Sequence, residues 1–248
     1  HGGLQSLNSS RVTAETQEVQ PLPLHVLDLR REGVEAFRVL QRASHIGKVV
    51  VSVKDSTAWM DGVAESMQSC CTLTGGTGAL GLLVGQWLVQ YGMGELVLLS
   101  RSGSTASGCT QHWEWLTGAG SAQASVQVEL CDIGQTEEVH QTLERGGTKA
   151  TGVVHSAGVL ADAFIAHQTQ AGMQKVWSPK AGAGWNLHQI SSKCGDVKMF
   201  VLFSSVAALL GNPGQANYAA ANASLDALAR LRRSNGLAGS SVQWGAWA

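Results

Sequence analysis

The chain has 248 residues, and its charges nearly cancel, because 17 Lys and Arg stand against 18 Asp and Glu. This balance offers no basic surface for nucleic acid or for an anionic membrane. Hydrophobic residues make up 44% and charged residues 14%, which is typical of a folded domain and excludes a disordered chain. No apolar run approaches the roughly 20 uncharged residues that span a bilayer.

The start of the chain, His1-Gly2-Gly3, has neither an initiator Met nor an apolar signal segment, so we expect a piece of a longer protein. The five cysteines include no Cys-x-x-Cys pair and no Cys/His set at zinc spacing, which predicts no metal site and a reducing compartment. Cys70 and Cys71 open an apolar run and are predicted to be core residues.

The first 66 residues differ in pattern from the rest. They predict a short helix over 34–40 and a strand over 48–53, followed by a polar segment over 54–68. We predict a domain boundary within 55–68. The alternative is that the N-terminal residues extend the sheet of the following domain.

From residue 69 onward, short apolar runs alternate with longer amphipathic segments. The predicted helices include 79–91, 136–144 and 215–233. The predicted strands are Ser69–Thr74, Leu96–Leu99, Val126–Leu130, Gly152–His155, Met199–Phe203 and Ser241–Trp244. Alternation of this kind, with nearly continuous apolar strands, predicts an α/β fold with a doubly wound parallel sheet of the Rossmann type.

A glycine-rich turn joins the first of these strands to the first helix. Glycines here let backbone N–H groups approach a pyrophosphate closely, and the helix N-terminus adds donors and a favourable dipole. The alternative is an ordinary tight turn, but the strand–turn–helix context favours a nucleotide. The predicted cofactor contacts are Gly75, Gly76, Thr77, Gly78, Ala79, Leu80 and Gly81.

The ends of the second and third strands bear on the choice of nucleotide. Ser100 and Arg101 end the second strand without a carboxylate, and an Arg there accommodates a ribose 2′-phosphate. Arg101 therefore favours NADPH, with a solvated Arg as the alternative. Cys131 and Asp132 follow the third strand, and Asp132 is predicted either to hydrogen-bond adenine or to be a helix N-cap.

Proton chemistry is suggested by Ser204-Ser205 and by the segment that runs from Asn217-Tyr218 to Asn222. A carbonyl that receives hydride needs a proton donor, and a phenol near a cation can serve. A serine hydroxyl can polarise the same carbonyl. Tyr218 and Asn222 are four residues apart, on one face of the predicted helix. The alternative is that Tyr218 is only a packing residue.

With these motifs in place, residues 69–248 resemble the ketoreductase domain of a modular type I polyketide synthase or an animal-type fatty acid synthase. Such domains belong to the short-chain dehydrogenase/reductase superfamily. The matching segments are Thr74–Gly81, Val153–Leu160, Ser178–Gly182, Phe203–Ala207, Gly211–Asn222 and Trp244-Gly245.

The resemblance implies a role for each site residue. Tyr218 would donate the proton and Ser205 would polarise the carbonyl, with Ser204 as the alternative serine. Most of the superfamily has Tyr-x-x-x-Lys, whereas this chain has Asn222 in the lysine position. The synthase ketoreductases place the lysine on an earlier helix, so Lys180 would bind the nicotinamide ribose and help the phenol release its proton. Asn222 would hold the proton relay.

Further implied contacts concern the cofactor and the stereochemistry of the product. The segment Ser156, Ala157 and Gly158 would also contact the cofactor. Leu160-Ala161-Asp162 resembles the Leu-x-Asp motif of B-type domains, which form the D-configured hydroxyl, although Ala161 departs from the more common Leu-Asp-Asp. Leu210 stands where A-type domains carry a Trp. We therefore expect B-type reduction.

The N-terminal region carries a second resemblance. Residues 21–26 and 35–50 look like the C-terminal tail of a synthase enoylreductase, which directly precedes the ketoreductase in fully reducing modules. We expect residues 1–54 to be this remnant, 55–68 a linker and 69–248 a ketoreductase domain. The chain stops at Ala248, where a substrate lid and later a carrier domain would follow, so we expect truncation at both ends.

These predictions combine into one function: NADPH-dependent reduction of a β-ketoacyl thioester to a β-hydroxyacyl thioester. The expected partners are an acyl carrier protein bearing a phosphopantetheine-linked chain and the neighbouring synthase domains, with no nucleic acid and no membrane. Alternatives are a catalytically silent domain of such a synthase and a free-standing short-chain dehydrogenase. We expect a cytoplasmic location, or a plastid if the parent protein carries a transit peptide outside this segment.

Overall fold

A computed structural model gives the fold. It divides into two compact units, residues 1–57 and 58–248, which are described separately. The described residues are 24–28, 32, 34–35, 38–39, 42, 48–52, 69–121, 124–145, 150–194 and 197–245. The predicted linker over 55–68 lies outside the described residues, as does most of the predicted remnant over 1–54.

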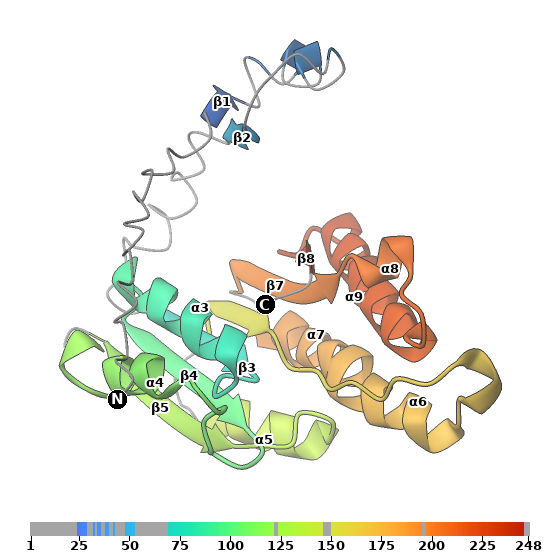
Figure 1. The fold of residues 1–248 in the computed structure, drawn as a ribbon. Coiled ribbons are helices and arrows are strands. Elements are labelled where there is room, and N and C mark those ends of the chain that lie inside the picture. The colour runs from blue at the N-terminus through green and yellow to red at the C-terminus, as the bar shows by residue number, and fades with distance from the viewer. Residues whose placement is uncertain are drawn as a thin grey trace, which may run out of the picture. The chain divides into compact units, whose positions relative to one another are not determined.

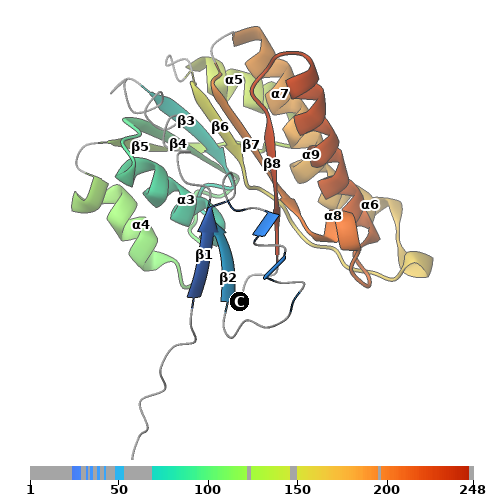
Figure 2. The ribbon, with the colours of Figure 1, turned by 90° about the horizontal axis from the view of Figure 1, so that it is seen from above.

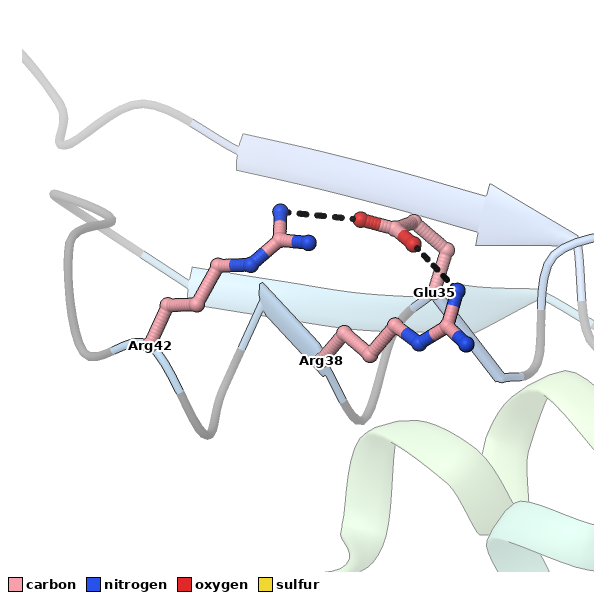
Figure 3. Close-up of polar contacts among 3 residues, drawn as sticks. All are labelled: Glu35, Arg38 and Arg42. Atoms are coloured by element: carbon pink, nitrogen blue, oxygen red, sulfur yellow. Dashed lines mark hydrogen bonds and ion pairs between the residues drawn. The ribbon is translucent and has the colours of Figure 1, made fainter.

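The first unit contains two parallel strands, β1 (Leu24–Asp28) and β2 (Lys48–Ser52), which form a sheet of their own. The strand predicted over 48–53 is confirmed, whereas β1 was not predicted. Between them, described residues of the segment 34–40 are helical. Glu35 there pairs with Arg38 at 3.6 Å and with Arg42 at 3.3 Å (Figure 3). Exposed ion pairs of this kind contribute little stability.

The second unit is built on one six-stranded sheet in which every pairing is parallel. Its order is β5-β4-β3-β6-β7-β8, so the chain reverses direction across the sheet between β3 and β6. Ligands of such sheets bind at this switch point, outside the carboxyl ends of the strands. The strands are β3 (Cys70–Thr74), β4 (Glu95–Ser100), β5 (Ser125–Leu130), β6 (Gly152–His155), β7 (Met199–Ser205) and β8 (Ser240–Trp244).

Helices cover both faces of this sheet (Figures 1 and 2). On one face α3 (Ala79–Gln90) and α4 (Thr110–Thr117) enclose a core with Leu73, Leu96 and Leu98. The opposite face packs on α5 (Thr136–Arg145), α7 (Ala183–Cys194) and α9 (Ala216–Ser234). The helix α6 (Gln170–Trp177) and a π-helix (Ser178–Gly182) pack against α9. Three short helices complete the unit: Ala119–Ser121, Ile165–His167 and α8 (Ala207–Leu210).

The structure confirms the predicted fold class. All five residues of β3 are buried, as expected for a central parallel strand with both faces covered. Cys70 and Cys71 lie in this strand and are core residues, as predicted. No described helix is both long and apolar enough to span a membrane.

Candidate active site

The glycine-rich turn lies between β3 and α3, at the switch point of the sheet. Gly75 has φ +65°, and a Cβ there would lie 2.9 Å from the Ala157 Cα. A Cβ on Gly81 would overlap the carbonyl oxygen of Gly75. The turn can therefore keep its shape only with glycine at these positions, because backbone packs directly against backbone.

The start of α3 provides unoccupied donors for an anion. Its N-cap is Gly78, no side chain caps it, and its first turn holds no acidic residue. The first N–H groups of a helix lack intrahelical partners, and the helix dipole favours negative charge there. A pyrophosphate fits this arrangement. The residues present thus suit a dinucleotide cofactor.

The predicted specificity residue lies near this turn. Ser100 ends β4 and its hydroxyl pairs with that of Thr77 at 2.8 Å, which links the strand end to the glycine turn. Arg101 follows and is exposed, so its guanidinium is accessible to a ligand or to solvent. Both predicted alternatives for Arg101 are compatible with this position.

The residues after β5 have different environments. The Cys131 side chain belongs to the hydrophobic core, so only its backbone could meet a cofactor. Asp132 accepts a hydrogen bond from the backbone N–H of Gly134 at 3.0 Å. The alternative of a helix N-cap at Asp132 is wrong, because α5 begins at Thr136 and Asp132 instead closes a turn before it.

Lys180 is a buried cation close to Tyr218. It lies in the π-helix Ser178–Gly182, and only 4% of its surface is exposed. Its ammonium donates to the Phe203 carbonyl at 3.1 Å and lies 5.1 Å from the centre of the Tyr218 ring. A Cβ on Gly158 would come within 3.2 Å of the same nitrogen. Burial lowers the pKa of Lys180 to about 8.

Tyr218 and Asn222 lie one turn apart on α9. The half-buried Tyr218 ring packs against Val176, Ala181 and Ala221. Asn222 is fully buried, and its side-chain amide donates to the Tyr218 carbonyl at 2.8 Å. Its Oδ1 has no hydrogen-bond partner among the described residues. A buried acceptor left open in this way can receive a proton donor when the site is filled.

The two candidate serines at the end of β7 differ in environment. Ser204 is 3% exposed, and its hydroxyl donates to the Asn222 carbonyl at 3.2 Å. Ser205 is half-buried, and its oxygen accepts from the Ala207 backbone N–H at 3.1 Å, which leaves its proton free to donate. The geometry therefore favours Ser205 over Ser204 as a donor to a ligand.

The predicted stereochemical motif contacts the start of α9. Asp162 accepts a hydrogen bond from the Gln215 amide at 3.0 Å, and the Ala161 carbonyl accepts one from the Asn217 amide at 2.7 Å. These bonds tie the motif to residues adjoining Tyr218. Leu210, in contrast, ends α8 and is 78% exposed.

The sequence did not predict the contacts of three polar residues in this region. Gln215 and Asn217 hold the Leu160–Asp162 loop, and His155 is buried beneath Lys180. A polar side chain that ends an otherwise apolar strand was the available signal for His155.

A large cavity elsewhere in the second unit contains few of the predicted site residues. A hollow of about 1360 Å³ lies against α3, β7 and β8, but Leu80 is the one predicted site residue that lines it. Its lining is mainly apolar, and its ionisable members His112, Lys198 and Arg233 include no carboxylate, so the carboxyl ends of the strands remain the candidate site. Among the described residues, no cluster of His, Cys, Asp or Glu could hold a metal ion.

Comparison with known proteins places this site in a family. The model of the KR domain family matches residues 69–248, and the chain belongs to that family of ketoreductase domains, which are nucleotide-dependent reductases of the short-chain dehydrogenase type. A solved structure described as A-type ketoreductases from a modular polyketide synthase is 39% identical, with a TM-score of 0.67. That match covers 73% of this chain and 38% of the solved one.

Its curated relatives are modular polyketide synthases. The phenolphthiocerol synthesis polyketide synthase Pks15/1 of Mycobacterium bovis is 41% identical over 98% of this chain. Erythronolide synthase EryA2 of Saccharopolyspora erythraea is 37% identical over 93%. The chain spans only 11% and 6% of these two proteins. A relative from Mycobacterium tuberculosis carries the word "inactive" in its name. It is 42% identical over 98% of this chain, and the chain covers 15% of its length.

Proposed function

We propose that residues 69–248 catalyse the NADPH-dependent reduction of a carrier-bound β-ketoacyl thioester to a β-hydroxyacyl thioester. The observation that supports the proposal is that Lys180 lies close to both Tyr218 and the end of β7, near the glycine turn. There the Lys180 ammonium lies 5.1 Å from the Tyr218 ring and donates to the residue two positions before Ser205.

The proposed mechanism assigns one task to each side chain. The cofactor would supply hydride to the β-carbon of the substrate. Tyr218 would give its phenolic proton to the carbonyl oxygen, while the free proton of Ser205 would hydrogen-bond the same oxygen. Lys180 has further N–H donors beyond the one directed at Phe203, and these are available to a ribose hydroxyl. The open Oδ1 of Asn222 would accept from the proton relay.

The finer features of the proposal rest on single residues. Arg101 is exposed at the end of β4, where a ribose 2′-phosphate would be met, and this supports NADPH over NADH. B-type reduction is supported by Asp162, which Gln215 holds against the helix that carries Tyr218. Chiral chromatography of the product tests this point, and an L-configured alcohol would contradict it.

The proposed setting is a multidomain synthase. Relatives of this chain align over as much as 98% of its residues, so they carry a counterpart of the first unit directly before the ketoreductase domain. We assign the first unit to the tail of an enoylreductase, and we assign an acyl carrier protein as the partner that delivers substrate. The described cysteines 70, 71, 109 and 131 are free thiols, which supports a reducing, cytoplasmic compartment.

The test is a Tyr218→Phe substitution in the full-length synthase. NADPH oxidation with a β-ketoacyl thioester should fall by roughly 10²- to 10⁴-fold, because the proton donor is lost. NADPH binding should be retained. Tyr91→Phe is the matched control, since Tyr91 is the other of the two tyrosines and is 56% exposed at the C-cap of α3. Wild-type turnover by the Tyr218 variant would refute the assignment.

A second candidate is a catalytically silent domain, and the relative named inactive favours considering it. Against it stands the complete set of Ser205, Tyr218, Lys180 and Asn222 beside an intact glycine turn. The same assay separates the two functions: a wild-type protein that binds NADPH but turns over no β-ketoacyl thioester would be silent.

A further inference from the structure

His155 is a fully buried imidazole at the end of β6 whose two nitrogens are both bonded. Nδ1 lies 2.7 Å from the hydroxyl of Thr74, the last residue of β3. Nε2 lies 2.8 Å from the backbone carbonyl of Lys180. The ring therefore bridges the strand that leads into the glycine turn and the π-helix that carries the lysine.

The chemistry of the two partners defines the tautomer. The Lys180 carbonyl can only accept, so Nε2 must carry the hydrogen. A neutral imidazole has one N–H, so Nδ1 accepts from the Thr74 hydroxyl. Burial lowers the pKa of His155 to about 4, and the Lys180 charge acts in the same direction, so the ring is neutral at physiological pH.

Lys180 is thereby held at both ends. Its ammonium is fixed by the Phe203 carbonyl at 3.1 Å and its backbone by His155. The surrounding turn is a single π-helical turn with Pro179 at its start, and such turns are wider and less regularly bonded than α-helix. The Lys180 carbonyl accepts from the backbone N–H of Ala183, and His155 adds a donor from outside the helix that ties this carbonyl to the end of β6.

We propose that His155 is a positioning residue for the reductase, acting through Lys180. It fixes the distance between the end of β3, which leads into the cofactor turn, and the lysine that meets the cofactor. The backbone reinforces this link, because Ser156 donates to the Thr74 carbonyl through both its N–H and its hydroxyl. The inference rests on the proposed function, in which Lys180 contacts the nicotinamide ribose.

The test compares His155→Gln with His155→Asn in the full-length synthase. The Gln amide can place a donor near the position of Nε2, whereas the Asn amide reaches only the position of Nδ1. We expect the Gln variant to stay within about threefold of wild type and the Asn variant to lose roughly tenfold in NADPH affinity and in kcat, because the Lys180 carbonyl loses its side-chain donor and keeps only the Ala183 N–H. His112→Gln, a change outside the site on α4, is the control.

Two further comparisons separate positioning from general stabilisation. In a Lys180→Met background, His155→Asn should cause no additional loss of NADPH affinity, because both changes act on one contact. If the His155 variants fail to fold, Thr74→Val and Thr74→Ser replace them. Only the Val variant removes the hydroxyl that orients the ring, and only it should weaken NADPH binding.

Affinity is read by fluorescence titration of NADPH and so does not depend on turnover. Equal affinities in the Gln and Asn variants, or additive losses with Lys180→Met, would overturn the role of His155. If the wild type binds NADPH but reduces no β-ketoacyl thioester, the proposed function fails, while the order of NADPH affinities still decides the role of His155.

Discussion

The two halves of the six-stranded sheet bury different polar side chains. In the half from β3 to β5, every polar residue described as buried carries a hydroxyl: Ser69, Thr72, Thr74, Thr77, Ser100 and Ser121. The half from β6 to β8 buries ionisable groups and amides as well: His155, Lys180, Asn186, Ser191, Ser204, Asn217, Asn222 and Arg232. Burying charge costs far more free energy than burying a hydroxyl. The half from β3 to β5, called the cofactor half, thus offers mainly backbone groups to a ligand. The half from β6 to β8, called the catalytic half, places ionisable and amide side chains at the site, which costs stability.

The two buried cations of the second half are satisfied to different degrees. Arg232 stacks 3.6 Å from the Phe200 ring centre and bonds the Ala238 carbonyl, Ser191 and His188. Lys180 has one described hydrogen bond, to Phe203. Arg232 is therefore structural and ties α9 to α7, while Lys180 keeps donors in reserve for a ligand.

The strongest test of this contrast between Lys180 and Arg232 is the Lys180→Met substitution, which removes the buried charge. Turnover should fall by roughly 10³-fold, as expected for loss of a group that assists proton transfer. The pKa of about 8 in the fold lies below the ordinary 10.5, so the buried ammonium costs stability at every pH below about 8. The free energy of unfolding at pH 7 should therefore rise, by at most about 3 kcal/mol.

The control for this change is Lys175→Met, an exposed lysine on α6. It should alter neither turnover nor stability. NADPH oxidation measures turnover, and urea unfolding measures the free energy of unfolding. If Lys180→Met lowered the free energy of unfolding, Lys180 would be a stabilising residue, and the contrast between the halves would fail.

The acid side of the pH–stability profile should report on His155 and on the half-buried His188, because burial lowers the pKa of both. The half from β3 to β5 buries no described His, Lys or Arg. The pKa of His155 is lowered from 6.5 to about 4, so its contribution is present above pH 6.5 and is lost as the pH falls toward 4. The free energy of unfolding should fall by about 3 kcal/mol across this window. His155→Gln should flatten the profile, and an unchanged slope in that variant would contradict the assignment.

The two halves also differ in how far their sequence predicts them. Short apolar or alternating runs predicted all six strands, and the glycine turn is one contiguous motif whose chemistry is local. The catalytic half is assembled from distant segments. His155 bonds Thr74 across 81 positions, and Gln215 and Asn217 bond the Leu160–Asp162 loop across 53 and 56.

No local sequence pattern identifies such distant partners, so the contacts of these three residues were not predicted. The position of Lys180 came from the family resemblance, because the bare superfamily motif would have placed a lysine where Asn222 stands. The π-helical turn around Lys180 was not predicted either, since no residue pattern distinguishes it from ordinary helix.

The cofactor half can be tested through its backbone with Gly81→Ala. The added Cβ would overlap the Gly75 carbonyl and lie 2.8 Å from the Gly76 Cα, so the turn must shift. NADPH affinity should fall by roughly 100-fold, as expected for loss of one or two hydrogen bonds to a charged phosphate. Gly85→Ala on the same helix is the control, because its Cβ would meet only the tips of leucine side chains. Equal affinities in the two variants would show that the turn does not contact phosphate.

The smallest expected effect concerns Arg101, an exposed cation that follows β4 in the cofactor half. Arg101→Ala should reduce the preference for NADPH over NADH by roughly tenfold, because a solvated Arg–phosphate contact is worth less than a buried one. Arg230→Ala, an exposed Arg on α9, should leave the preference unchanged. The ratio of kcat/KM for the two cofactors measures it. An unchanged ratio for Arg101→Ala would make this residue a solvated arginine, and the cofactor half would then bind its nucleotide through backbone alone.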